Sequence, residues 1–209
     1  MRTADPIKRG LTLSDFPRTI KVADNVYTYE DFHSGDEKFT TTNMFVVTRD
    51  GVVVADGQGG RAETRGLVDA IAKVTPQPIK YVVICSDHGD HTAGNASFPP
   101  GVTYIIHPTS KAILDRSATG WKLSVALPRQ KILFLSETFL NRVFSAMRSA
   151  YPTEWLRALD KAEVMKADVY IPEAIQHAKW GEYATWTLAA SQEPIAIRKV
   201  YEELDGKLR

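Results

Sequence analysis

Short runs of apolar residues, alternating in part with polar ones, fill the first third of the chain and predict β-strands. Three strands are expected, at 25–32, 43–48 and 52–56. The turn Arg49–Gly51 between the last two is typical of a β-hairpin. The polar run at 33–42 is predicted to be a loop or a longer hairpin tip.

A helical spacing then replaces the alternation. Within 61–74, the apolar positions Leu67, Ala70, Ile71 and Val74 share one helical face. Three shorter elements follow. An apolar strand at 79–85 resembles the buried centre of a sheet. A second strand is predicted at 101–107, and a short helix with a proline near its start is predicted at 108–116.

The second half repeats this order of elements. A hairpin, an amphipathic helix, a buried strand and a terminal helical region are predicted at 122–136, 152–165, 167–172 and 179–206. Pro194 is expected to break or kink the last of them. Strands and crossover helices in both halves predict an α/β fold in which two packed sheets have helices outside, a four-layer αββα sandwich in a single domain, 1–209.

Composition narrows the partners of this domain. The 209 residues are 44% apolar and 24% charged, which is ordinary for one globular domain. The 26 Lys and Arg against 25 Asp and Glu give a net charge of +1. Such a balance provides no strong field for nucleic acid or an anionic membrane, so neither is expected as a partner. Composition does not indicate an oligomeric state.

The compartment is expected to be the cytoplasm. A single cysteine, Cys85, excludes an internal disulfide framework and fits a reducing environment. The first twenty residues have no apolar core of a signal peptide, and no stretch reaches the roughly 18 apolar residues of a membrane span.

The segment Ile84–Asn95, which reads ICSDHGDHTAGN, holds the most concentrated chemistry. His88, Asp90 and His91 form an H-x-D-H pattern just after the end of an apolar strand, where α/β folds bind ligands. Imidazoles and a carboxylate suit zinc, iron or manganese. The alternative is a solvated polar turn whose side chains cap backbone groups.

Four segments together resemble the metallo-β-lactamase superfamily. They read NMFVVTRDGVVVADG, YVVICSDHGDHTAGN, LSVALPRQKILFLSETFLN and ADVYIPEAIQ, and they match in order and spacing the superfamily's opening hairpin, its H-x-H-x-D-H loop, its later hairpin and its last motif strand. The resemblance covers most of the chain. It implies the αββα sandwich, and hydrolysis by a metal-activated hydroxide at a centre of one or two metals.

The resemblance also implies a metal set, carried over position by position. His88, Asp90 and His91 match, and Glu137 stands at the metal-bridging aspartate. Three further ligand positions fall on residues that are not usable, Ser86, Ala118 and Ala174, and Lys122 places a positive charge near one of them. One metal is therefore expected at most, zinc or else iron or manganese, with Asp90 and His88 as catalytic residues. The segment between His107 and Lys131 is also shorter than in the superfamily, which is expected to widen or remove the cleft.

Other residues receive supporting roles. Asp56 and Asp87 are expected around the metal ligands. His177 is a candidate rescue ligand in place of Ala174, with an exposed histidine at the start of a helix as the favoured alternative. Pocket residues for an anionic group are predicted at Asn141, Arg142, Arg148 and Tyr151, with packing of this loop on the core as the alternative. Structural or solvated roles are expected for His33, His107 and Cys85.

Two functions remain open. The first is a metallohydrolase in which His91, Asp90 and Glu137 hold one divalent metal, with His88 near the attacking water and a small ester, thioester or lactam-like substrate. The second is a metal-free relative, or a truncated or engineered variant, that keeps the fold and acts as a binding or scaffold protein. A flavin-linked oxygen-reducing relative is less favoured, because no flavin domain follows in the sequence.

Overall fold

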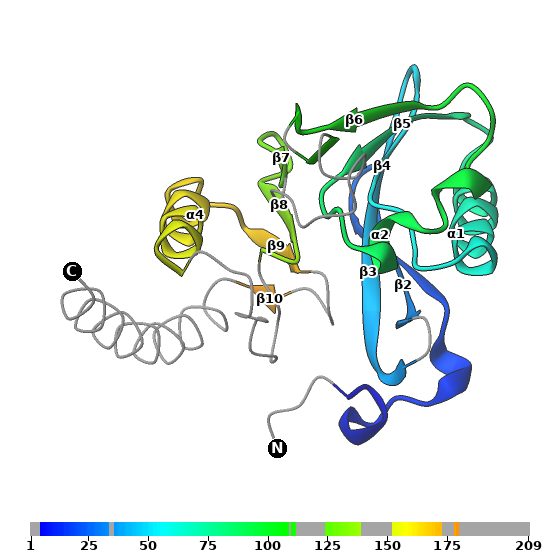
Figure 1. Ribbon diagram of the computed structural model, residues 1–209, viewed down its shortest axis with the longest axis horizontal. Helices are drawn as coiled ribbons and strands as arrows, with labels where there is room; N and C mark the ends of the chain where they lie inside the picture. Colours follow the sequence, from blue (N-terminus) through cyan, green and yellow to red (C-terminus); the bar gives the residue numbers. More distant parts are fainter. Residues whose placement is uncertain are drawn as a thin grey trace.

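The computed structural model describes residues 5–33, 36–108, 110–111, 124–138, 152–172 and 178–179. Two β-sheets and two long helices make up this part of the chain (Figure 1). Short 3-10 helices lie at Ile7–Arg9, Leu13–Asp15 and Asn95–Ser97. No helix of these described segments is long and apolar enough to cross a membrane.

The first sheet has six strands in the order of the sequence. They are β1 (Arg18–Ala23), β2 (Val26–His33), β3 (Asp36–Thr48), β4 (Gly51–Ala55), β5 (Ile79–Ile84) and β6 (Thr103–Ile106). The first four pair antiparallel through hairpins, and β5 and β6 add in parallel. The β4–β5 connection carries α1 (Arg61–Val74), as a parallel crossover requires.

The second sheet has four strands in the order β10-β9-β8-β7. β7 (Val125–Leu127) and β8 (Ile132–Ser136) form an antiparallel hairpin, and β9 (Val169–Pro172) lies parallel to β8. The crossover between β8 and β9 carries α4 (Pro152–Val164), and β10 is the short strand Ala178–Lys179.

Three apolar clusters hold the layers together, and alternation along the strands decides which residue enters which cluster. In β8, Ile132 and Phe134 face the first sheet, whereas Leu133 and Leu135 face α4. The middle cluster joins the two sheets, since it also contains residues of β2, β3 and β4.

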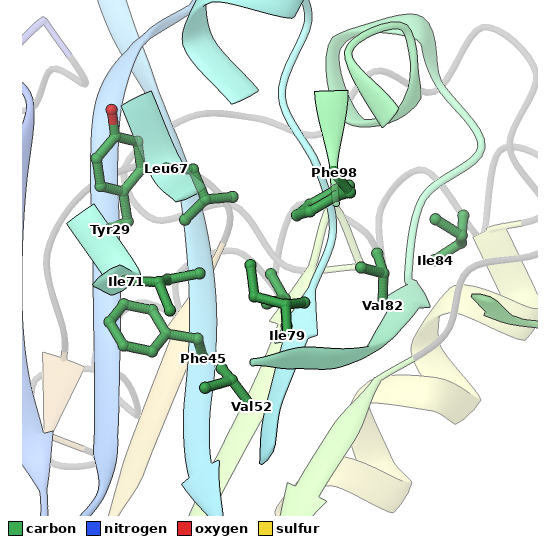
Figure 2. Packing of buried hydrophobic residues seen from close by; sticks show 10 residues of the cluster. Tyr29, Phe45, Val52, Leu67, Ile71, Ile79, Val82, Ile84 and Phe98 are labelled. Carbon is green, nitrogen blue, oxygen red and sulfur yellow. The ribbon is translucent and has the colours of Figure 1, made fainter. Parts of the chain in front are cut away.

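Helix α1 covers the other face of the first sheet. Leu67 and Ile71, on the predicted apolar face of α1, pack with Tyr29, Phe45 and Ile79 (Figure 2). Helix α1 and helix α4 therefore lie on opposite outer faces of the paired sheets (Figure 1). The layers are those of the predicted αββα sandwich.

Most predicted elements are confirmed within one to three residues. In the second sheet β10 was not predicted, since Lys179 was expected to begin the terminal helical region. The other exceptions lie in the first sheet. The run 33–42 is not a loop, because β3 begins at Asp36 and pairs with β2 as far as His33. Strand β1 was not predicted. The strand expected to be central, β5, is second from the edge, and its Lys80 and Tyr81 are exposed. The terminal helical region beyond Lys179 and most of the helix expected at 108–116 lie outside the described residues.

Candidate metal centre

The carboxyl ends of β4, β5 and β8 meet at one edge of the sandwich, and each is followed within two residues by a polar side chain. Asp56 follows β4, Ser86 follows Cys85 beyond β5, and Glu137 follows β8. Two of these strands belong to the first sheet and one to the second. Side chains that are distant in the sequence are therefore brought together where the two sheets open, the usual place for a ligand site in α/β folds.

Asp56 is the organising residue of this edge. It is fully buried and has a left-handed backbone, φ 63°. Its Oδ1 accepts hydrogen bonds from the backbone N–H groups of Cys85, 2.6 Å, and Ser86, 3.1 Å. Its Oδ2 accepts one from the Ser136 hydroxyl at 2.8 Å and lies 3.1 Å from His91 Nδ1. One carboxylate thus connects three strand ends, and the expected supporting role of Asp56 agrees with these contacts.

A second buried residue, Asn43, holds the turn that contains Asp56. The Asn43 side-chain amide donates to the backbone carbonyls of Ala55, Asp56 and Gly57, at 3.4, 3.1 and 2.8 Å. Gln58 Nε2 donates in turn to Asn43 Oδ1 at 2.5 Å. Sequence reasoning missed both residues. The available signal was an amide side chain at the start of the apolar run 43–48, since such a group needs partners when buried.

His91 is the most deeply placed histidine of the loop. Its side chain is fully buried, and its Nδ1 faces Asp56. Because the carboxylate can only accept, we assign the proton to Nδ1, which leaves Nε2 as the basic nitrogen. His91 Nε2 lies 3.6 Å from Asp90 Oδ2. A carboxylate that fixes one nitrogen of an imidazole is the usual outer partner of a metal-binding histidine.

Glu137 reaches across from the second sheet to the H-x-D-H loop. Its Oε1 lies 2.7 Å from His88 Nδ1, and its Oε2 accepts a short hydrogen bond from the Ser86 hydroxyl. The side chain of Glu137 is 15% exposed and that of His88 is 42% exposed. His88 is thus the member of the pair that faces solvent.

His88, Asp90 and Glu137 form the group that could hold a cation. One donor atom from each lies within 4.8 Å of the other two, and no second group of three such side chains occurs in the segments that the structure describes. One imidazole nitrogen and two carboxylate oxygens are a donor set that fits a single zinc, iron or manganese ion. The predicted set also contained His91, which lies behind Asp90 in this arrangement.

The remaining predicted residues are only partly described. Asp87 is buried within the loop, and His107 is half-buried after β6. Cys85 is buried, and its pKa is raised well above the ordinary thiol value by desolvation and by the nearby Asp56 charge. It is therefore a small core residue, as expected, and a weak nucleophile. Several predicted residues lie outside the described part of the chain, namely Ala118, Lys122, Asn141, Arg142, Arg148, Tyr151, Ala174 and His177.

Comparison with models of protein families and with curated proteins finds no match to this chain. Solved structures do match. A metallo-β-lactamase from Pontibacter korlensis aligns with a TM-score of 0.69 at 18% identity over 78% of this chain and 93% of its own. The metallo-β-lactamase FIM-1 from Pseudomonas aeruginosa, in a mono-zinc form, aligns with a TM-score of 0.70 at 13% identity over 85% of this chain and 96% of its own.

A third metallo-β-lactamase, from Erythrobacter litoralis, aligns with a TM-score of 0.67 at 13% identity over 77% of this chain and 90% of its own. The αββα sandwich described above is therefore the metallo-β-lactamase fold, as the sequence motifs indicated. Since identities are this low, the likeness concerns the fold, and function has to be argued from the site.

Proposed function

We propose that the protein is a metal-dependent hydrolase with one divalent cation held by His88, Asp90 and Glu137. The observation that carries the proposal is the convergence of these three donors, from two sheets, to within 4.8 Å of one another. Three protein ligands are the usual number at a catalytic zinc site. The likeness to a mono-zinc metallo-β-lactamase supports the choice of zinc, with iron or manganese as the alternatives.

The residues around the three donors have distinct proposed roles. A bound cation would supply Lewis acidity that polarises a substrate carbonyl. Asp90, as an ionised carboxylate beside the exposed His88, would orient the attacking water and accept its proton. His91, fixed by Asp56 through Nδ1, would present Nε2 beside Asp90 as a fourth ligand. The proposed substrate is a small ester, thioester or lactam-like molecule in the cytoplasm.

Metal analysis of the purified full-length protein tests this proposal first. About one equivalent of Zn, Fe or Mn after metal-supplemented growth is expected. His88→Ala and His91→Ala should each lower the bound metal and the hydrolysis of a chromogenic ester, a thioester and a β-lactam. His107→Ala is the matched control, because it removes a half-buried imidazole that follows β6 outside the donor group. Less than about a tenth of an equivalent in the wild type would rule out the metallohydrolase.

A second function has one observation in its favour. Ser86 and His88 both contact the Glu137 carboxylate, so the acid has protein partners without a cation. A metal-free binding or scaffold protein with this fold would have the same contacts around Glu137. It would retain its melting temperature after exhaustive chelation, whereas a metal-loaded hydrolase would lose the stabilisation that its ligand provides.

A further inference from the structure

Ser86 occupies the first ligand position of the loop and is the residue whose role the metal set leaves open. Its side chain is fully buried, in contrast to the partly exposed His88 and Asp90. Its backbone N–H is held by Asp56 at 3.1 Å, and its hydroxyl donates to Glu137 Oε2. The backbone N–H and the hydroxyl of Ser86 are therefore bound to two carboxylates that follow two different strands, β4 and β8.

We propose that Ser86 is a positioning residue of the metal site, which turns the Glu137 carboxylate toward His88 and Asp90. The inference rests on the proposed single-metal centre. Glu137 follows β8 in the second sheet, whereas His88 and Asp90 follow β5 of the first sheet, at the start of the short helix α2 (Gly89–Thr92). A flexible glutamate that must reach across this junction needs a fixed donor on the far side. The Ser86 hydroxyl is that donor.

The contact with Ser86 determines which oxygen of the Glu137 carboxylate faces His88. Ser86 engages Oε2, and Oε1 is then directed to His88 Nδ1, 2.7 Å away. With Oε2 engaged, Glu137 offers the cation chiefly Oε1. A neutral hydroxyl is also a poorer metal ligand than an imidazole or a carboxylate, so Ser86 does not create a site for a second cation. Ser86 thus favours a centre of one cation with a preset glutamate.

The Ser86–Glu137 contact explains how the site could bind a cation although a serine stands at the first ligand position. A hydrogen bond to a charged acceptor is about twice as strong as one between neutral groups, and burial protects it from competition by water. Outer partners of metal ligands typically account for about 10- to 100-fold in metal affinity. That range is the expected loss when the Ser86 hydroxyl is removed.

The test compares dissociation constants for Zn²⁺ and Mn²⁺ in the full-length wild type, Ser86→Ala, Ser86→Thr and Ser97→Ala. Ser97→Ala is the matched control, since it removes a hydroxyl from the same connection at a site outside the donor group. We expect one equivalent in the wild type, about 10- to 100-fold weaker binding in Ser86→Ala, and partial recovery in Ser86→Thr, which keeps the hydroxyl. The cobalt-loaded proteins should differ in their visible absorption, because the loss of an oriented carboxylate changes the ligand geometry.

The outcomes separate the two proposals. If the wild type binds metal and Ser86→Ala binds it within about twofold, the positioning role is wrong and the metal site stands. If Ser86→Thr is as weak as Ser86→Ala, the hydroxyl is not the active group and the inference also fails. If the wild type binds no metal, both the metallohydrolase and the role of Ser86 in it are overturned. Should Ser86→Ala not fold, Ser86→Gly removes the same hydroxyl and is judged by the same criteria.

Discussion

Replacing Asn43 by leucine should destabilise the protein strongly, because this one side chain makes hydrogen bonds to several buried groups. The two side chains have similar size, but leucine can neither donate to nor accept from the turn. In the structure the Asn43 amide donates to three successive carbonyls, and the two shorter contacts, to Asp56 and Gly57, are 3.1 and 2.8 Å long. Its own oxygen accepts from Gln58. All of these groups are buried.

The magnitude follows from the polar groups that the change leaves without Asn43. The Asp56 and Gly57 carbonyls and the Gln58 amide each lose a partner. An unsatisfied buried polar group costs about 1–3 kcal/mol, so the low end of the range for three groups gives a loss of about 3 kcal/mol. For a domain of this size each kcal/mol corresponds to about 2–4 °C, so the melting temperature should fall by about 6–12 °C.

Thermal and urea denaturation of the metal-free protein measure this loss without interference from a bound cation. Gln77→Leu is the control, since it makes a similar change of side chain in the half-buried turn before β5. The loss of stability in Gln58→Leu should lie between those of Asn43→Leu and Gln77→Leu. This change removes the hydrogen bond to Asn43 Oδ1 and leaves the bonds that the Asn43 amide donates in place. A loss for Asn43→Leu within about 0.5 kcal/mol of the control would refute the assignment of Asn43 as the residue that holds the Asp56 turn.

Three further predictions concern the same edge and its surroundings. Gly57→Ala should lower both the melting temperature and the metal affinity, because a Cβ at this position would lie 2.1 Å from Asn95 Oδ1 and 3.0 Å from the His91 carbonyl oxygen. Gly89→Ala should be nearly neutral, since a Cβ there would have no atom within 4 Å. Equal melting temperatures for the two variants would contradict the packing argument. Burial raises the pKa of the Asp31 carboxyl, so its contribution to stability is present below the ordinary aspartate pKa and is lost as pH rises through the folded value. Asp31→Asn should therefore gain stability over the wild type at about pH 7 and not at about pH 3 in denaturant titrations, and the opposite order would show that the hydrogen bonds of Asp31 outweigh its desolvation. Desolvation raises the pKa of Cys85, so a disulfide reagent at about pH 8 should modify it slowly in the folded protein and rapidly in denaturant, and a fast reaction in the folded protein would contradict its burial.

The extent to which the sequence predicted the fold differs between apolar and polar segments. Strands β4, β8 and β9 and both long helices were located because their apolar residues follow the period of one element. The first part of β3 was missed because Thr40, Thr41 and Thr42 are polar, and all three are nevertheless buried. Their burial depends on pairing with β2 and on partners such as Glu30, which accepts from the Thr40 hydroxyl at 2.7 Å. A hydropathy pattern contains no information about such partners.

The candidate site divides in the same way. His88, Asp90 and His91 are neighbours in the sequence, so their spacing and the strand before them indicated a metal loop, with a solvated polar turn as the alternative. Glu137 was located by its place after the second hairpin, through the resemblance to a known family. The meaning of Ser86 could not be obtained by either route, because it depends on a contact between residues 51 positions apart on two sheets. A motif compared position by position identifies Ser86 as a lost ligand, whereas the structure shows a donor to a neighbouring acid.

That difference changes how the incomplete motif should be interpreted. The Glu137 side chain is mostly buried, and a charge in such a place is costly unless it has a fixed partner. Here the acid is bound by Ser86 and His88, and Asp56 fixes the Ser86 backbone together with the Ser136 hydroxyl of β8. The ends of β5 and β8 are thereby connected twice, once through Asp56 and once through Glu137. If either connection alone can hold the two strand ends, Ser86→Ala and Ser136→Ala should lower stability by more in combination than the sum of the single changes. Strict additivity in this double-mutant cycle would mean that the two carboxylates act independently.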